Sequence, residues 1–294
     1  EIEAAVADDD FSTQSTRGYL FATGRFDLPR DFKLRFNAEL TSDDTFLLDH
    51  DISEKDRLQS GISVERARRD EYVRVALDHF KSLRADERNA TLPRIIANGA
   101  YERRVFPARI GGELRLSALA HGHYRTSDLE TDGPDFDVFA DGRDVSRFTA
   151  ALDWRRDWVL PAGVLATARA GLAIDHFEVS DIGATGDDRA TELTPSAALR
   201  LRWPLVRRGG GVGGATHVIE PVMQLAWAGG SDPDIPGDES TAVEFDEGNL
   251  FSLSRFPAPD RRERDLSGAV GLSYARISPD GWQGRLALGQ VFRD

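Results

Sequence analysis

The sequence predicts an all-β protein built from long antiparallel strands, of the kind that close into a barrel across a membrane. Apolar and polar residues alternate along many segments, without a fault from Phe32 to Thr41. Successive side chains of a strand point to opposite faces, so such a segment has one apolar and one polar face. The connections between these segments are short in some places and long and polar in others. Short turns on one side and long loops on the other are typical of outer-membrane barrels.

Twelve strands follow from the alternation. They span residues 16–26, 31–41, 58–68, 71–83, 94–103, 110–126, 143–156, 160–178, 191–205, 214–228, 262–277 and 281–293. Many exceed the roughly 5–6 residues of a soluble strand and reach the about 9–11 residues that cross a membrane. The loops 127–142, 179–190 and 229–261 are long and acidic, and no amphipathic helix of four turns is evident.

Composition excludes several classes of protein. The 294 residues include 37 basic and 50 acidic side chains, a net charge of −13. Nucleic-acid binding depends on lysine and arginine at phosphates, so we expect no nucleic-acid partner. With no cysteine, the chain has no disulfide, thiolate metal site or cysteine nucleophile. The start Glu1-Ile2-Glu3 lacks the basic and apolar regions of a signal peptide, so we expect a mature form or a piece of a longer protein.

Alternation alone does not separate a barrel from a soluble sandwich, because only the surroundings of the apolar face differ. Three cues favour the barrel: the length of segments 110–126 and 160–178, apolar sets of alanine, leucine and valine without charge, and aromatic residues near strand ends. These aromatic residues are Tyr19, Phe32, Tyr101, Phe106, Tyr124, Trp154, Trp203, Trp227 and Trp282. A soluble secreted β-sandwich that acts as a binding module remains an alternative.

Residues 219–263 carry the most specific pattern. In order they contain Ile219-Glu220-Pro221, Asp238-Glu239-Ser240, Asn249-Leu250-Phe251, Arg255-Phe256 and Asp260-Arg261-Arg262-Glu263. This ordered set resembles the outer-membrane LPS-assembly protein family, LptD, whose barrel has the same succession within about forty residues. Segments 43–46 and 56–60 also resemble the start of the family's barrel, so the resemblance covers nearly the whole chain.

The resemblance implies a fold and a set of partners. Residues 1–294 would form part of one outer-membrane β-barrel domain, about 12 of the family's 26 antiparallel transmembrane strands. We expect the family's signal peptide and N-terminal periplasmic jelly-roll to be absent from residues 1–294. The implied partners are lipopolysaccharide (LPS), membrane lipid, an LptE-like plug lipoprotein in the lumen, and an LptA-like periplasmic bridge reached through the missing N-terminal domain.

The resemblance also implies a function, which is transport and not catalysis. A translocon component in the outer membrane of a Gram-negative bacterium would insert LPS into the outer leaflet, through a barrel lumen and a lateral gate. No enzyme activity, cofactor or metal is expected. A porin-like channel or nutrient-receptor barrel is the alternative, and it would lack the pattern of residues 219–263.

The family-motif positions are the first group of candidate site residues. They are Glu220, Pro221, Asp238, Ser240, Asn249, Leu250, Phe251, Arg255, Asp260, Arg261 and Glu263. We favour a lumenal salt-bridge network of Glu220, Arg255, Asp260 and Arg261 that holds a long loop inside the barrel, over direct contact with LPS. A proline within a strand predicts a bulge or an interruption at Pro221.

Basic residues on the polar faces are the second group. The candidate lumen-facing contacts to LPS are Lys33, Arg35, Arg115, Arg147, Arg155, Arg169, Arg200 and Arg202. Cross-strand pairs with acidic neighbours are the alternative and favoured role for them. His121 and His123 share one face, but third and fourth metal ligands are not evident, so we expect a solvated pair.

Overall fold

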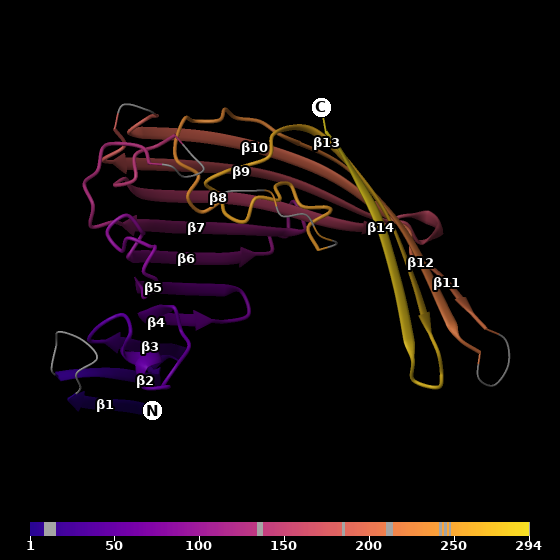
Figure 1. Ribbon diagram of the computed structural model, residues 1–294. Helices are drawn as coiled ribbons and strands as arrows, with labels where there is room; N and C mark the ends of the chain where they lie inside the picture. Colours follow the sequence, from indigo (N-terminus) through magenta and orange to yellow (C-terminus); the bar gives the residue numbers. More distant parts are fainter. Residues whose placement is uncertain are drawn as a thin grey trace.

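The computed structural model describes residues 1–8, 16–133, 138–183, 186–209, 214–240, 243, 246 and 248–293. Within them, 14 antiparallel strands form one sheet, which confirms the all-β class. The sheet curves strongly but its ends do not meet, as a part of a barrel would (Figure 1). Strands β1 to β10 and β12 to β14 pair in sequence order, and β11 pairs with β12 beside this path.

The strand bounds agree with the predicted ranges to within a few residues. The strands are β1 (Ile2–Asp8), β2 (Thr16–Leu28), β3 (Phe32–Thr41), β4 (Arg57–Ala67), β5 (Glu71–Ser82), β6 (Ile95–Val105), β7 (Glu113–Tyr124), β8 (Asp144–Val159), β9 (Leu165–Ser180), β10 (Arg189–Arg202), β11 (Leu205–Arg208), β12 (Thr216–Ala228), β13 (Asp265–Ile277) and β14 (Gln283–Arg293). Three short helices, α1 (Phe46–Asp49), η1 (Pro29–Asp31) and η2 (Pro161–Gly163), lie in connections.

Two strands were not predicted. The first, β1, pairs with β2 from Ile2 to Asp8 and has alanine at positions where the alternation calls for polar residues. The second, β11, lies beyond the predicted strand 191–205 except for its first residue, Leu205. Pro204 follows β10 and has no backbone N–H to donate, so the ladder stops there and a new short strand begins at Leu205.

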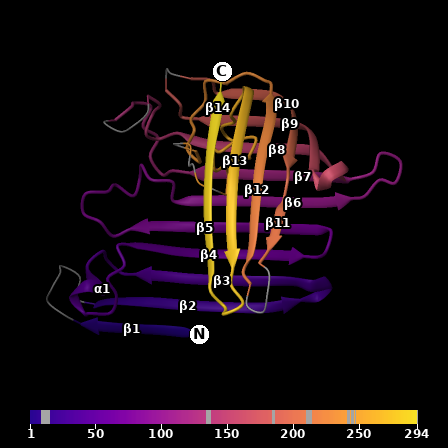
Figure 2. The ribbon, with the colours of Figure 1, turned by 90° about the vertical axis from the view of Figure 1, so that its right-hand side faces the viewer.

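Short and long connections separate to opposite ends of the sheet, as predicted. The turns after β2, β4, β6, β8 and β13 are short, whereas the connections after β3, β5, β7 and β12 are long. The connection after β9, predicted as a long loop over 179–190, is shorter and spans residues 181–188. Figure 2 shows β12, β13 and β14 crossing in front of the earlier strands. No helix among the described residues is long and apolar enough to span a membrane.

A small apolar core lies at the long-loop end of the first strands, in a segment that resembles the family pattern. Phe46 and Leu58 are buried there. The guanidinium of Arg17, which is fully buried, pairs with Asp43 at 2.7 Å and with Asp49 at 2.8 Å. Hydrogen bonding from Arg17 holds the pKa of Asp43 well below its usual range, although burial opposes this. The core therefore fixes the long connection between β3 and β4 against β2.

The two faces of the sheet have inverted polarity. We call the face covered by the 229–264 loop the inner face, and the opposite one the outer face. Buried polar side chains such as Thr149 and Asp175, 3 % and 1 % exposed, lie on the inner face. Apolar side chains such as Phe148 and Leu199 are about half exposed on the outer face. A soluble sandwich buries its apolar face, so this arrangement fits a partial membrane barrel instead.

We expect an arginine on the outer face to disturb assembly more than one on the inner face. Leu199→Arg would place a charge on the apolar band of β10, which costs about 2–4 kcal/mol at the middle of a bilayer. Ser117→Arg, on the polar face of β7, is the matched control. Heat-modifiable gel mobility of membrane fractions measures assembly, and equal mobility of the two variants would contradict the assignment of the faces.

Candidate functional site

The candidate site is the 229–264 loop and the inner face that it covers. Both views place this loop inside the curve of the sheet, between β7–β9 and β12–β14 (Figures 1 and 2). The attachments described below join the loop to β8, β9, β10, β13 and β14 and to the ends of β7 and β8. Most of the motif residues predicted from the sequence lie in this loop.

The first attachment joins Asp238 to the β7–β8 region. The Asp238 carboxylate accepts hydrogen bonds from Arg143 at 2.6 Å and 3.3 Å, and lies 3.1 Å from Nε2 of His123. The guanidinium of Arg125 lies 3.7 Å from the same carboxylate. Burial alone would raise the pKa of Asp238, but the hydrogen bonds from His123 and Arg143, and the charges of Arg143 and Arg125, hold it well below its usual range.

Glu239 makes the neighbouring attachment to β8. Its carboxylate accepts two hydrogen bonds of 2.8 Å from Arg147, in the forked geometry that arginine forms with carboxylates. Burial raises the pKa of Glu239, and Arg147 offsets only part of that rise. His121 lies 3.4 Å from Glu239 and 3.3 Å from His123. The two histidines therefore face the loop instead of solvent, which corrects the prediction of a solvated pair.

The part of the loop that follows Glu239 is held by hydrogen bonds within the loop and by ion pairs to β9 and β10. The backbone N–H of Glu239 donates to Asp260 at 3.0 Å, and the buried Ser240 hydroxyl accepts from the N–H of Ala258 at 3.0 Å. Arg262 donates to Asp175 of β9 at 2.9 Å and 3.0 Å. Arg264 pairs with Glu192 of β10 at 2.5 Å. Asp260 and Ser240 thus shape the loop, while the arginines attach it to the sheet.

A buried ion pair lies at the centre of the loop and connects it to β14. The Arg255 side chain, 1 % exposed, pairs with Glu263, which also pairs with Arg293 of β14 at 2.5 Å. Arg255 donates a further hydrogen bond, of 3.1 Å, to the carbonyl of Leu250. Removing one partner of such a buried pair leaves an uncompensated charge, so these residues fix one loop conformation.

Leu250 and Phe251 press against a part of the wall that has no side chains. Gly271 of β13 and Gly289 of β14 are directly opposite each other. A Cβ atom at Gly271 would lie 3.0 Å from the Phe251 ring, and one at Gly289 would overlap the Leu250 side chain. Arg200 stacks over the Phe251 ring at 4.8 Å and donates to the Phe251 carbonyl at 2.6 Å. We call this contact the glycine notch.

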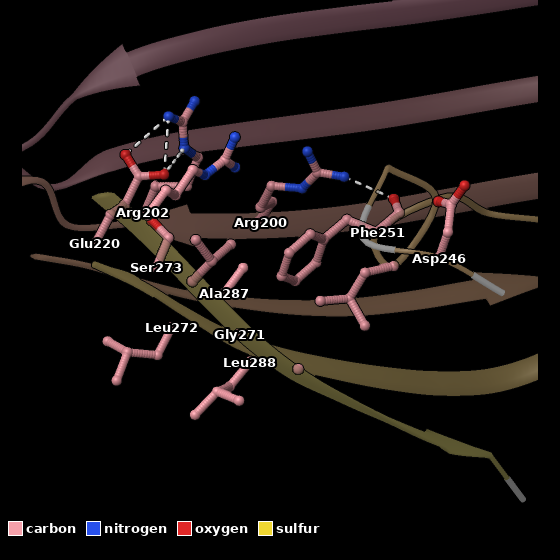
Figure 3. Close-up of a pocket in the computed structure, with 14 residues that line it drawn as sticks. Arg200, Arg202, Glu220, Asp246, Phe251, Gly271, Leu272, Ser273, Ala287 and Leu288 are labelled. Atoms are coloured by element: carbon pink, nitrogen blue, oxygen red, sulfur yellow. Dashed lines mark hydrogen bonds and ion pairs between the residues drawn. The ribbon is translucent and has the colours of Figure 1, made fainter. Parts of the chain in front are cut away.

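A cavity of about 430 Å³ opens beside the glycine notch, between the loop and β10, β12, β13 and β14 (Figure 3). Arg200, Arg202 and Glu220 lie on its polar side, and Phe251 projects into it from the loop. Glu220 accepts hydrogen bonds from Arg202 at 2.8–3.2 Å. The cavity is thus apolar near the notch and charged toward the short-turn end of the strands.

Three further motif positions, Pro221, Arg261 and Asn249, have local structural roles. Pro221 lies between the part of β12 that pairs with β11, up to Ile219, and the part that pairs with β10, from Val222. The β12–β13 register passes Pro221 without a bulge, so the predicted interruption occurs on one side only. Arg261 packs against Gly237, where a Cβ would overlap its guanidinium. Asn249 accepts a hydrogen bond of 3.0 Å from the N–H of Asp246.

The basic candidates lie mostly in cross-strand or local ion pairs. Pairs form from Arg35 to Glu65 (2.7 Å), Arg115 to Asp153 (3.5 Å), Arg147 to Glu239 (2.7 Å), Arg155 to Asp157 (3.1 Å) and Arg202 to Glu220 (2.8 Å). Lys33 faces Glu65 across the β3–β4 ladder. Arg200 contacts only the neutral oxygens of Gln224 and Phe251 among the hydrogen bonds described. Over the described residues, no ion pair forms at Arg169.

Sequence reasoning missed several residues that hold the loop. Arg143 and Arg262 meet carboxylates 95 and 87 residues away. No local pattern indicates such partners, although both arginines stand beside predicted strand ends. No group of three histidine, cysteine, aspartate or glutamate side chains that could hold a metal occurs among the described residues.

Comparison with known proteins gives one match. The family model described as LPS transport system D matches residues 15–293, which is most of the chain and includes the loop and its anchors. No curated protein matches the chain.

We expect Asp238→Asn to release the loop. Without its negative charge, the buried pairs of Asp238 with Arg143 and Arg125 are broken, and breaking a buried pair costs about 3–5 kcal/mol. Asp232→Asn is the matched control in the same loop, because Asp232 is 80 % exposed and its pair with Arg264 is worth at most about 1 kcal/mol. Trypsin cleavage within residues 255–264 measures release, and equal cleavage rates in both variants would refute the anchoring role.

We expect Gly289→Ala to displace Leu250 from the glycine notch. Gly284→Ala, on the same strand, is the control, because the nearest atom to its added Cβ would be 3.7 Å away. Faster proteolysis of the loop in the Gly289 variant alone is the expected result. If both variants resist the protease like the unmodified protein, the notch does not hold the loop.

Proposed function

The chain belongs to the LPS transport system D family, and from this we propose that it inserts LPS into the outer leaflet of the outer membrane through the lumen and a lateral opening of a β-barrel. The family is a transport component of the outer membrane. The observation that carries the finer proposal is the inverted polarity of the sheet. An apolar outer face suits membrane lipid, and a charged inner face suits the sugars and phosphates of LPS.

The open edges of the sheet support a larger barrel. In the described residues, β1 pairs only with β2, and β14 only with β13. Unpaired backbone N–H and C=O groups are very costly in hydrocarbon, so a membrane sheet has to close. We therefore propose that residues 1–294 form part of one outer-membrane barrel domain and that further strands complete it.

The inner face supports a route for an anionic head group. Arg115, Arg155, Arg169, Arg200 and Arg202 lie in the half of the strands next to the short turns. Short turns face the periplasm in outer-membrane barrels. An incoming head group would meet these arginines first and the 229–264 loop next, so the loop has to move or be bypassed.

Two protein partners complete the proposal. An LptE-like plug lipoprotein would contact the inner face of β1 to β6, beyond the strands to which ion pairs attach the loop. An LptA-like periplasmic bridge would deliver LPS to the short-turn end. Neither role requires enzyme chemistry, since insertion of LPS forms and breaks no covalent bond.

Site-specific photo-crosslinking in living cells tests the route. A photoreactive residue at Ser117, on the inner face of β7, is expected to capture LPS. The same residue at Leu116, on the outer face near the short-turn end, is the control, because that position faces phospholipid of the inner leaflet. Absence of LPS adducts at Ser117, or unchanged surface LPS after depletion of the protein, would overturn the proposal.

A further inference from the structure

Three arginines converge on the inner face of β8, β9 and β10. Arg155 of β8 lies directly opposite Arg169 of β9 in the sheet register. Arg200 of β10 is the diagonal neighbour of Arg169, because Arg169 opposes Ala198 and Arg200 opposes Thr167. Like charges directly opposite each other on one face destabilise a sheet. A sheet that keeps this arrangement needs a counter-charge near Arg169.

The carboxylates nearby supply only part of that counter-charge, because Asp157 and Asp153 attract Arg169 without forming an ion pair with it. Asp157 is 3.1 Å from Arg155, and Asp153 is 3.5 Å from Arg115 on the adjacent strand. Glu113 opposes Arg155 across the β7–β8 ladder, on the side away from β9. Thus the acidic groups gather toward β7 and β8. On β9 and β10, Arg169 and Arg200 form no ion pair with any described carboxylate.

A cavity gives a ligand access to this group. It has a volume of about 300 Å³ and is lined by Arg115, Arg155 and Arg169, with Glu113 and Asp153 beside them, from the wall and by Ser252 and Leu253 from the loop. This volume is at the lower end of the range for small-molecule sites. Arg200 lines the neighbouring cavity beside the glycine notch instead, where it donates to the carbonyl of Phe251.

We propose that Arg155 and Arg169 form an anion subsite for a phosphomonoester, beneath residues 252–253 of the loop. The planar guanidinium binds phosphate through paired hydrogen bonds, and the Ser252 hydroxyl is a further donor at the roof of the cavity. We take the phosphomonoester to be the phosphorylated sugar of the transported glycolipid, and in this respect the inference rests on the proposed function. Free phosphate has the same chemistry, and the experiment separates the two sources.

The test in cells uses a photoreactive residue at Leu253, which lines the cavity. Arg169→Gln and Arg155→Gln are each expected to lower the LPS adduct roughly tenfold, the loss of about one charge-assisted hydrogen bond. Arg169→Lys should retain part of it. The control is Arg189→Gln, at the other end of β10, where the side chain is 68 % exposed. Heat-modifiable gel mobility selects variants that assemble normally.

A second arm uses the purified protein in detergent. Lipid A is compared with dephosphorylated lipid A, and inorganic phosphate is added as a competitor. Preference for the phosphorylated lipid that disappears in Arg169→Gln identifies a lipid-borne phosphate. Binding of inorganic phosphate that requires Arg169, without that preference, identifies free phosphate.

The outcomes separate the subsite from the transport function. The subsite is refuted by two results together. Assembled Arg169→Gln and Arg155→Gln variants give the same LPS adducts as the unmodified protein, and they bind lipid A and inorganic phosphate as the unmodified protein does. Adducts at Ser117 would then show that transport through the lumen still stands. Loss of adducts at both Leu253 and Ser117 in the unmodified protein would instead refute the proposed function.

Discussion

The register of the sheet is the constraint on which the rest of the structure depends. Because side chains alternate between faces, a shift of one residue in any strand would turn its polar groups toward the apolar face. The register sets Thr149 opposite Asp175, so that the threonine hydroxyl donates to the carboxylate at 2.6 Å on the inner face. Asp175 in turn receives Arg262 from the loop. The β8–β9 register therefore determines both how these strands pair and where the loop is attached.

The loop is held mainly by charge, and this has a cost. Taking Arg255 and Glu263 out of water requires desolvation that their attraction only partly offsets, so such pairs select one conformation more than they add stability. The apolar contribution is local: Leu250 and Phe251 fit where Gly271 and Gly289 leave the wall bare. The combination of distant ion pairs and one close-fitting contact determines the position of the loop.

The sequence allowed most of the sheet to be predicted, because alternation is a local signal. The strand Phe32–Thr41 was predicted within one residue. The strand β1 was missed because alanine blurs its alternation, and β11 was missed because it has only four residues after Pro204. The fold class and the family resemblance agree with the structure and with the family match.

The candidate site was less predictable, for a physical reason. The motif placed Asp238 and Asp260 in one loop, but their partners depend on how a long chain folds back over distant strands. No pattern of neighbouring residues in the sequence indicates the contact of Asp238 with Arg143 or the glycine notch. The notch needs Gly271 and Gly289 to be opposite each other, which only the β13–β14 register reveals.

The attachments of the loop also divide the wall mechanically. They run from the β7–β8 end, through Asp175 of β9 and Glu192 of β10, to Arg293 of β14. The loop therefore acts as a strut across this arc, and spreading any two of its strands would pull on several ion pairs in series. The strands from β1 to β6 lie beyond the strut. The sheet is thus a stiff arc joined to a compliant one, and tension in the wall would be relieved first in the compliant part.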